Sequence, residues 1–255
     1  MFEKNVFIFW TGKEYSLIKI LRELIYLHSN NGKNYKVHLL NDDNVKYYIK
    51  NIPPKYYKLR PAHKADFVRV NVICEYGGIW LDSDTIVMNN LSSLFKILEN
   101  KNGFFIREDN IYIVNGIFGS KKNTKLINKW KNIINNNLKT IPINKLHNQN
   151  YWTIFGSKIL NDFDKNNKEL YKNYLIYNGL NNLYPIYWSN CVSEFIEKPY
   201  ENYKKIIREF QPVIVLVNSV YKKLENLNED IIKSKKMPIN YFINKSYENS
   251  KLYKI

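Results

Sequence analysis

Residues 63–87 read HKADFVRVNVICEYGGIWLDSDTIV, a stretch in which a predicted helix runs directly into a predicted strand. The helix, expected over residues 62–76, is indicated by apolar residues at helical spacing: Ala65, Val68, Val72 and Tyr76. Gly77-Gly78 ends it, because glycine adopts the left-handed cap conformation without a steric penalty. Ile79-Trp80-Leu81 is then a short apolar run, typical of a strand that is buried on both faces.

Two carboxylates, Asp82 and Asp84, follow this strand directly. Ligands of open α/β sheets usually bind at the carboxyl ends of strands, and alternate residues of an extended segment point the same way. Two carboxylates this close repel each other unless a cation is present, and hard oxygen ligands suit Mg²⁺ or Mn²⁺ together with substrate phosphates. The pair is therefore a candidate metal site for a phosphate-bearing substrate. The alternative is that both side chains cap a turn.

The helix before the strand carries a second pair of charged residues, Asp66 and Arg69. They lie three residues apart and therefore share a helix face, close to where the strand delivers its carboxylates. A guanidinium there can meet a phosphate, and a carboxylate can accept hydrogen bonds from ribose hydroxyls. The alternative is a local ion pair, which contributes only about 0.2–0.5 kcal/mol.

The flanking sequence alternates between strand and helix patterns. Residues 6–10 and 35–40 are apolar runs that predict strands, whereas residues 14–28 and 41–49 predict helices. This order favours an α/β fold with a mostly parallel sheet.

The remainder of the chain continues the α/β pattern. Two strands are expected over residues 104–118, with Gly116 and Gly119 near a turn. Further elements are predicted as helices over 123–138 and 152–161 and a strand over 213–217. Residues 1–222 are expected to form one domain, and the lysine-rich residues 223–255 an extension packed on it.

The composition is ordinary for a globular protein: among 255 residues, 45% are hydrophobic and 24% are charged. The net charge of +16 comes from short basic clusters within polar stretches, which indicates a solvated face that attracts anionic substrates. It does not predict a nucleic-acid partner, although it permits peripheral membrane contact.

The two cysteines, Cys74 and Cys191, form no metal-binding cluster and suit a reducing compartment. Without a signal-peptide pattern or a run of about 20 apolar residues, the chain is expected to be soluble and cytoplasmic.

Two weaker features allow other readings. Asp162-Phe-Asp164 resembles the start of an EF-hand loop but lacks its glycine and glutamate, so a polar helix end on the surface is expected. His63 is the only histidine near the acidic pair, and we interpret it as a helix cap or a surface group. If it acted as a base, the chain would be a metal-dependent nuclease or phosphotransferase. A non-catalytic basic binding protein is the other alternative.

The pattern Asp66, Arg69, Gly77-Gly78, apolar strand, Asp82, Asp84 resembles a known family. It is similar to glycosyltransferases whose sugar-binding region contains a DXD motif (family 32-like), which include capsular polysaccharide synthesis proteins and Och-type α-mannosyltransferases. The glucosylating bacterial toxins share this core more distantly. The resemblance implies a GT-A-type fold, a Rossmann-like mixed sheet flanked by helices, with a helical or irregular C-terminal extension.

Other segments extend the resemblance. Residues 9–12 are similar to the family's first strand and loop, which hold the nucleotide base, and residues 115–120 to the segment beside the donor sugar. Residues 184–188 resemble a Tyr-Pro region, and residues 218–221 a closing Ser-x-Trp motif. The resemblance therefore implies a donor site formed by Phe9, Trp10, Thr11, Asp66, Arg69, Asp82, Ser83, Asn115, Ser219 and Tyr221.

The resemblance also implies a metal and a reaction. Mn²⁺ or Mg²⁺ would be held by Asp84, Asp82, Asn218 and Ser219, and the residues implied in catalysis are Asp82, Asp84 and Arg69. The expected reaction moves a sugar from a nucleotide diphosphate, preferably a UDP-sugar, to a hydroxyl of a glycan or glycoconjugate, with retention of configuration. The metal would neutralise the departing diphosphate.

Two departures from the family concern the end of this site. Leu216 stands where the family often has a histidine or an acidic metal ligand, and Tyr221 replaces the tryptophan. Because the Leu216 side chain has no ligating atom, Asn218 or the diphosphate oxygens are left to complete the coordination.

Overall fold

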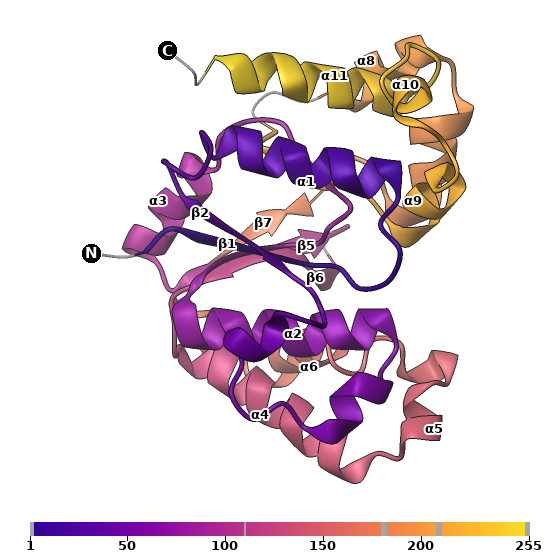
Figure 1. The fold of residues 1–255 in the computed structure, drawn as a ribbon. Coiled ribbons are helices and arrows are strands. Elements are labelled where there is room, and N and C mark those ends of the chain that lie inside the picture. Colours follow the sequence, from indigo (N-terminus) through magenta and orange to yellow (C-terminus); the bar gives the residue numbers. More distant parts are fainter. Residues whose placement is uncertain (1–2, 110, 180–182, 208–210, 253–255) are drawn as a thin grey trace.

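The computed structural model describes residues 3–109, 111–179, 183–207 and 211–252. Its centre is a six-stranded sheet in the order β2-β1-β3-β6-β5-β7, which lies between two layers of helices (Figure 1). The strands are β1 (Asn5–Phe9), β2 (Lys36–Leu40), β3 (Gly78–Leu81), β5 (Gly103–Glu108), β6 (Tyr112–Ser120) and β7 (Tyr174–Asn178). β1 pairs in parallel with β2 and β3, and β5 with β7, whereas β6 runs antiparallel to both β3 and β5. The predicted mixed sheet flanked by helices is confirmed.

The central strands are apolar because both faces of the sheet are covered. Val6 and Ile8 of β1 belong to one apolar cluster, and Phe7 and Phe9 belong to another on the opposite face. Trp80 of β3 joins the cluster of Phe7. Alternate residues of a strand point to opposite faces, so this division explains the continuous apolar runs in the sequence.

Helices cover both faces of the central sheet. α2 (Pro61–Tyr76), α4 (Lys125–Thr140) and α6 (Ser157–Asn166) form the lower layer in Figure 1. α1 (Ser16–His28) and α3 (Ser92–Asn100) lie on the other face, and α11 (Pro238–Lys251) packs over α1. The short helices are α5 (Ile143–Leu146), α8 (Tyr203–Ile206), α9 (Asn218–Leu224) and α10 (Glu229–Ile232).

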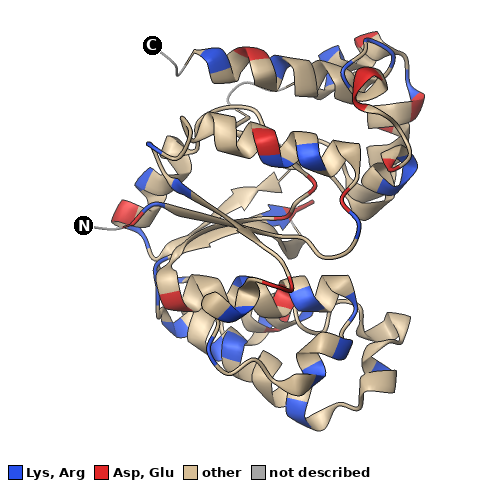
Figure 2. Ribbon diagram, viewed as in Figure 1, with Lys and Arg blue, Asp and Glu red and all other residues tan. Residues whose placement is uncertain are grey.

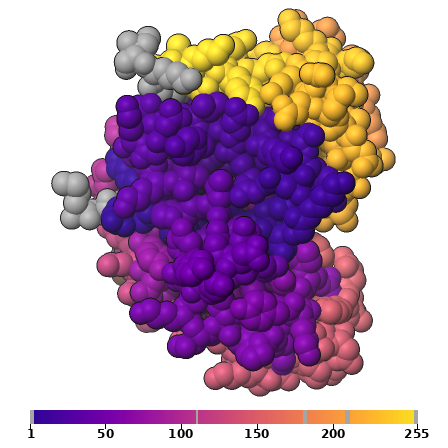
Figure 3. Space-filling model, viewed as in Figure 1, coloured from indigo at the N-terminus to yellow at the C-terminus, as the bar shows by residue number. Residues whose placement is uncertain are grey.

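A second, two-stranded sheet joins distant parts of the chain. In it, β4 (Thr85–Val87) pairs antiparallel with β8 (Val213–Val215). The C-terminal segment covers this region, and Figure 3 shows it packed against the N-terminal part of the chain. Phe242 and Ile243 of α11 share an apolar cluster with Leu21 and Leu24 of α1. The segment expected as an extension from residue 223 thus begins inside α9 and contributes to this core.

The turn between α2 and β3 depends on its two glycines. Gly77 has a φ of +67° and Gly78 a φ of +122°, and residues other than glycine rarely adopt such backbone angles. A Cβ at Gly78 would also lie 2.3 Å from the carbonyl oxygen of Asn5 on β1. The glycine pair therefore stops the helix, as predicted, and allows β3 to approach β1.

Three sequence predictions need correction. The helix expected over residues 41–49 is one 3-10 turn, Val45–Tyr47, because the Asn41 side chain accepts the backbone N–H groups of Asp43 and Asn44 and so competes with helix formation. Gly116 and Gly119 lie inside β6, which continues past the expected end at residue 118 to Ser120; close neighbouring side chains leave no room for a Cβ there. The helix expected over 152–161 begins at Ser157 and ends at Asn166.

Several further elements were missing from the prediction, among them α3, β4, β7 and α9. Lys and Arg lie on helices of both layers in Figure 2, so the charge is spread over the surface in this view. Across the described ranges, none of the helices combines the length and the apolar character needed to cross a membrane.

Candidate active site

A cavity of about 780 Å³ opens at the carboxyl ends of the strands β1, β3 and β5 of the central sheet. Because β6 is antiparallel to both β3 and β5, these two strands run in the same direction, and β3 runs parallel to β1. All three carboxyl ends therefore meet at this edge, where open α/β sheets usually bind ligands. One end of α2 and the segment from β8 into α9 complete the walls.

Asp82 and Asp84 both line this cavity. Asp82 accepts a hydrogen bond from Trp80 Nε1 (2.8 Å), and its own backbone N–H donates to the carbonyl of Gly116 (2.7 Å). Ser83 lies between Asp82 and Asp84, and its Oγ donates to the carbonyl of Phe9 (2.8 Å). The acidic segment is thus fixed to both neighbouring strands, and the Asp82 side chain stays 32% exposed, toward the cavity.

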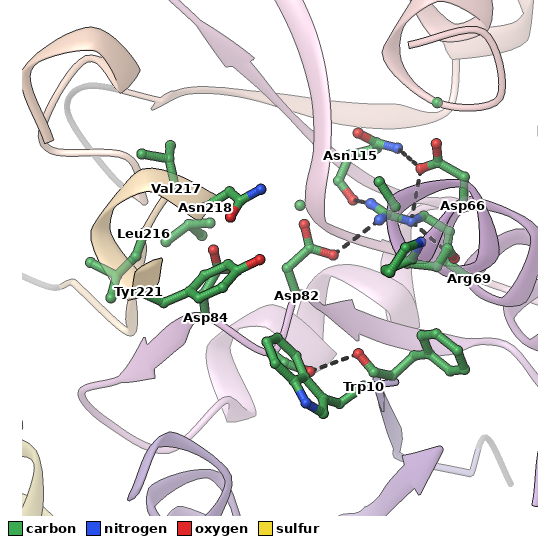
Figure 4. Close-up of a pocket in the computed structure, with 18 of the residues that line it drawn as sticks. Trp10, Asp66, Arg69, Asp82, Asp84, Asn115, Leu216, Val217, Asn218 and Tyr221 are labelled. Atoms are coloured by element: carbon green, nitrogen blue, oxygen red, sulfur yellow. Dashed lines mark hydrogen bonds and ion pairs between the residues drawn. The ribbon is translucent and has the colours of Figure 1, made fainter. Parts of the chain in front are cut away.

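Arg69 connects α2 to the acidic pair, as the helix spacing predicted. Its Nη2 lies 3.1 Å from Asp82 Oδ1, its Nε lies 3.3 Å from Asp66 Oδ1, and its Nη1 donates to the carbonyl of Asn115 (Figure 4). Asn115 Nδ2 in turn donates to Asp66 Oδ1 (2.8 Å). The guanidinium also lies over the Trp80 ring, 5.0 Å from its centroid. Arg69 is therefore held in one orientation.

The carboxylates outnumber the cations that neutralise them. Burial raises the pKa of Asp84 well above its usual value, and the charge of Asp82 raises it further. Burial also raises the pKa of Asp82, against the lowering effect of Arg69, and raises that of Asp66 to about 6. A cation between the carboxylates would stabilise their ionised forms.

The residues present fit a divalent cation. Although no group of three His, Cys, Asp or Glu side chains forms a metal site within the described ranges, an amide oxygen is available as a third ligand. Asn218 Oδ1 is buried without a hydrogen-bond partner and lines the same cavity. In Figure 4, Asn218 and Tyr221 lie to one side of Asp82, and Arg69 lies to the other. Two carboxylates and one amide oxygen are hard ligands of the kind that Mg²⁺ and Mn²⁺ prefer.

An aromatic wall stands on the β1 side of the cavity. The rings of Trp10 and Tyr221 meet edge to face, with centroids 5.5 Å apart. Thr11 donates to the carboxylate of Asp42, which also accepts from Lys64 Nζ (2.7 Å) and from Tyr56. Burial opposes ionisation of Asp42, but these hydrogen bonds hold its pKa below the usual value. Asp42, expected only as a helix cap, thus anchors the loop after β1.

The cavity brings together nearly all of the predicted site residues. They are Phe9, Trp10, Thr11, Asp66, Arg69, Asp82, Ser83, Asp84, Asn115, Asn218 and Tyr221. Ser219 is the exception, because its side chain is exposed on α9 and does not line the cavity. Leu216 lines the cavity and packs in the apolar cluster beneath α1.

The prediction for His63 is wrong. This residue is fully buried, with Nε2 2.9 Å from the carbonyl oxygen of Tyr151 and its ring 4.9 Å from that of Phe155. The segment before α6, whose position the sequence did not reveal, folds over it. His63 does not line the cavity. The second Asp-x-Asp copy lies on α6 as expected, with Asp164 paired to Arg107 and Asp162 to Lys158.

Several residues of the cavity were not predicted as site residues, among them Glu108, Trp152, Gly156 and Trp188. Glu108 ends β5 and is buried, and a Cβ at Gly156 would lie 2.4 Å from Asn115 Nδ2. The only available signal for Glu108 was its position after an apolar run, which marks the end of a strand.

Residues 1–249 match the family described as "Capsular polysaccharide synthesis protein". The chain belongs to this family. The membership agrees with the resemblance that residues 63–87 indicated.

The chain is also similar to one curated protein and to two solved structures. The chain is 24% identical over 153 residues to "O-glycosyltransferase PaGT" of Phomopsis amygdali; the match covers 50% of this chain and 37% of PaGT, so the chain spans little more than a third of that relative. It superposes with a TM-score of 0.52 on the glycosyltransferase GlyE of Streptococcus pneumoniae TIGR4 (15% identity, 98% of this chain, 64% of that chain). The TM-score is 0.51 for a glycosyltransferase involved in glycosylation of the major capsid of PBCV-1 (11% identity, 87% of this chain, 97% of that chain). The shared fold is that of GT-A glycosyltransferases, as predicted.

Proposed function

We propose that this chain is a metal-dependent glycosyltransferase that moves a sugar from a nucleotide diphosphate donor to a hydroxyl of a glycan or glycoconjugate. The observation that carries the proposal is the convergence of Asp82, Asp84 and the unpartnered Asn218 Oδ1 in one cavity, beside Arg69. Family membership and the shared fold support it. The preference for a UDP-sugar and the retention of configuration rest on the resemblance of residues 63–87 to DXD-containing transferases.

The side chains divide the work around the donor. Asp84, Asp82 and Asn218 would hold Mn²⁺ or Mg²⁺, and the bound cation would supply positive charge against the diphosphate leaving group. Arg69 orients Asp82 and adds fixed positive charge, which a preorganised site applies without rearrangement. Lys13 and Lys222 line the same cavity and add to its positive potential.

The remaining donor contacts follow from the walls. Trp10 and Tyr221 offer aromatic surface to the nucleotide, and Asp66 and Asn115, which are hydrogen-bonded to each other, face the donor sugar. Two free cysteines favour a reducing compartment, so we place the activity in the cytoplasm.

The two alternatives have less support. A nuclease or phosphotransferase that used His63 as its base is disfavoured, because this histidine is buried away from the cavity. A non-catalytic basic binding protein leaves unexplained why five carboxylates and an orphaned amide oxygen line one cavity at an energetic cost.

A thermal-shift experiment with UDP-, GDP- and CMP-sugars, with and without Mn²⁺, tests the proposal. We expect Mn²⁺-dependent stabilisation by one nucleotide diphosphate class, about 2.7 kcal/mol at a ligand concentration 100 times Kd. Asp84→Ala should abolish it. Asp162→Ala, in the second Asp-x-Asp copy on the surface, is the matched control and should keep it. Absence of a shift with all three classes in the unchanged chain would overturn the proposal.

A further inference from the structure

The cavity continues past the acidic pair to a part of the sheet that the proposed donor site does not use. β5 lies two positions from β3 in the sheet and runs parallel to it. Neighbouring strands are about 4.8 Å apart, so the two carboxyl ends are separated by roughly 10 Å. The aromatic wall of Trp10 and Tyr221 lies on the other side of β3. The β5 end therefore offers space for a second ligand.

Glu108, the last residue of β5, is a buried carboxylate without a cation. It is 8% exposed, and none of the described Lys or Arg side chains forms an ion pair with it. Its Oε1 accepts a hydrogen bond from the backbone N–H of Trp188 (3.3 Å). An ionised carboxylate has about four acceptor positions, so Glu108 retains capacity for hydroxyl donors of a ligand in the cavity.

Trp188, beside Glu108, presents a large aromatic surface at the cavity. Its side chain is 56% exposed although it lines the cavity, and its ring contacts only Tyr187 among the described aromatic pairs (centroids 5.7 Å apart). A pyranose ring has an apolar C–H face, which packs on an aromatic ring, and an edge of hydroxyls, which hydrogen-bond to a carboxylate. The corner of Trp188 and Glu108 combines both requirements.

Tyr184 and Gly116 connect this corner to the acidic pair. A Cβ at Gly116 would lie 2.6 Å from the Tyr184 hydroxyl and 3.1 Å from Asp82 Oδ2, so both groups border the same space. Burial raises the pKa of Tyr184, and the charges of Asp82 and Glu108 raise it further, because both carboxylates lie near this hydroxyl. A ligand at Glu108 is therefore next to the proposed reaction centre.

A second exposed tryptophan, Trp152, is less suited to this role. The guanidinium of Arg60 already covers one face of its ring, 5.3 Å from the centroid. Arg60 is fixed there, because its Nη2 donates to the carbonyls of Leu146 (2.6 Å) and Asn148 (3.0 Å). Trp152 also belongs to the wall next to Gly156, where an added Cβ would meet Asn115 Nδ2 at 2.4 Å and Asp66 Oδ1 at 2.9 Å.

We infer that Trp188 and Glu108 form the acceptor subsite, and that they select a neutral hexopyranose residue over an acidic one. The inference rests on the proposed transferase function. Trp188 stacks on the C–H face of the acceptor sugar, and Glu108 accepts hydrogen bonds from its hydroxyls. A uronic acid would bring a second carboxylate against Glu108, and like charges in a partly desolvated site repel strongly.

Saturation-transfer NMR with methyl glycosides tests the subsite directly, in the presence of UDP and Mn²⁺. The probes are the methyl glycosides of glucose, galactose and mannose, and methyl glucuronide. At least one neutral glycoside should bind, with a Kd raised roughly tenfold or more by Trp188→Ala and largely restored by Trp188→Phe. Methyl glucuronide should bind only after Glu108→Gln. Tyr47→Ala, which removes an aromatic side chain that is 76% exposed outside the cavity, should change nothing.

Several outcomes would overturn the inference: no binding of any neutral glycoside, unchanged binding in Trp188→Ala, equal binding of methyl glucuronide to the unchanged chain, or loss of binding in Trp152→Ala instead. Thermal denaturation of each variant confirms that it is folded. Donor binding is measured separately by the Mn²⁺-dependent thermal shift. If the donor shift is absent but glycosides bind at Trp188, the proposed function fails and the sugar subsite remains. If the shift is present but Trp188→Ala has no effect on glycosides, only the subsite fails.

Discussion

Arg69 Nη2 lies 3.1 Å from Asp82 Oδ1, and this contact joins α2 to the acidic segment after β3. The same guanidinium approaches Asp66 (3.3 Å), so one cation serves two carboxylates. Because both Arg69 and Asp66 are buried, the interaction has consequences for stability as well as for the site.

Arg69→Lys should therefore be costly. A lysine cannot reach Asp82, Asp66 and the Asn115 carbonyl together, and a buried charge that loses its partner destabilises by about 3–5 kcal/mol. We expect a loss of this order in urea denaturation, together with loss of the Mn²⁺-dependent donor shift. The matched control is Arg107→Lys, at a more exposed arginine–aspartate pair, where about 1 kcal/mol or less is expected. Equal losses in both variants would show that Arg69 has no special role.

Gly116→Ala should impair the site through steric contact. The new Cβ would lie 2.6 Å from the Tyr184 hydroxyl and 3.1 Å from Asp82 Oδ2, both too close for unstrained packing. We expect lower transferase activity and a loss of stability of about 1–3 kcal/mol. Tyr184→Phe removes the hydroxyl, so the double variant should recover part of the stability. Additive losses in the double-variant cycle would contradict this contact.

Asp66 should make the stability of the metal-free protein fall as the pH rises from 4 to 6. Burial raises its pKa from 3.8 to about 6, against the lowering effect of Arg69. In this window the native state keeps the proton that the unfolded chain releases, so rising pH favours unfolding. Relative to Asp66→Asn, the free energy of unfolding should drop by on the order of 2 kcal/mol.

Urea denaturation of both proteins in EDTA at several pH values measures this difference. If it instead grows in favour of the unchanged chain as the pH rises, ion pairing with Arg69 dominates over burial and the predicted direction is wrong.

Phe242→Ala should reveal whether α11 is part of the core. The ring of Phe242 is fully buried in the cluster that includes Leu21 and Leu24 of α1, so its truncation should cost about 3–5 kcal/mol. Leu252→Ala, at a side chain that is 68% exposed, should cost less than about 0.5 kcal/mol. A small effect of Phe242→Ala in urea denaturation would favour a separable extension after residue 222.

Features that depend on local sequence could be predicted. The glycine pair at 77–78, the α2 periodicity and the strand of Trp80 are each encoded within a few residues, and they place Asp66, Arg69 and Asp82 on one side without knowledge of the rest. The spacing of Asp66 and Arg69 predicted that both side chains face the site, because a helix fixes the relative directions of residues three apart.

Features that depend on the order of strands in the sheet could not be predicted from the sequence. Glu108 belongs to the cavity only because β6 inserts antiparallel between β3 and β5, which brings the carboxyl end of β5 to the same edge. The burial of His63 likewise depends on where residues 151 and 152 fold. Ser219 was displaced from the cavity for a similar reason, because the turn from β8 into α9 decides which of two adjacent side chains points inward.

The pairing of β4 with β8 has a consequence for how the site forms. The carbonyl of Asp84 accepts a hydrogen bond from the backbone N–H of Leu216 (3.0 Å), and Thr85 pairs with Val215, about half the chain away. During synthesis, the ribosome must therefore translate well beyond residue 216 before Asp84 acquires its final backbone position. Contacts of such large sequence separation form slowly, so the nascent chain gains the final geometry of its acidic pair among the last steps of folding.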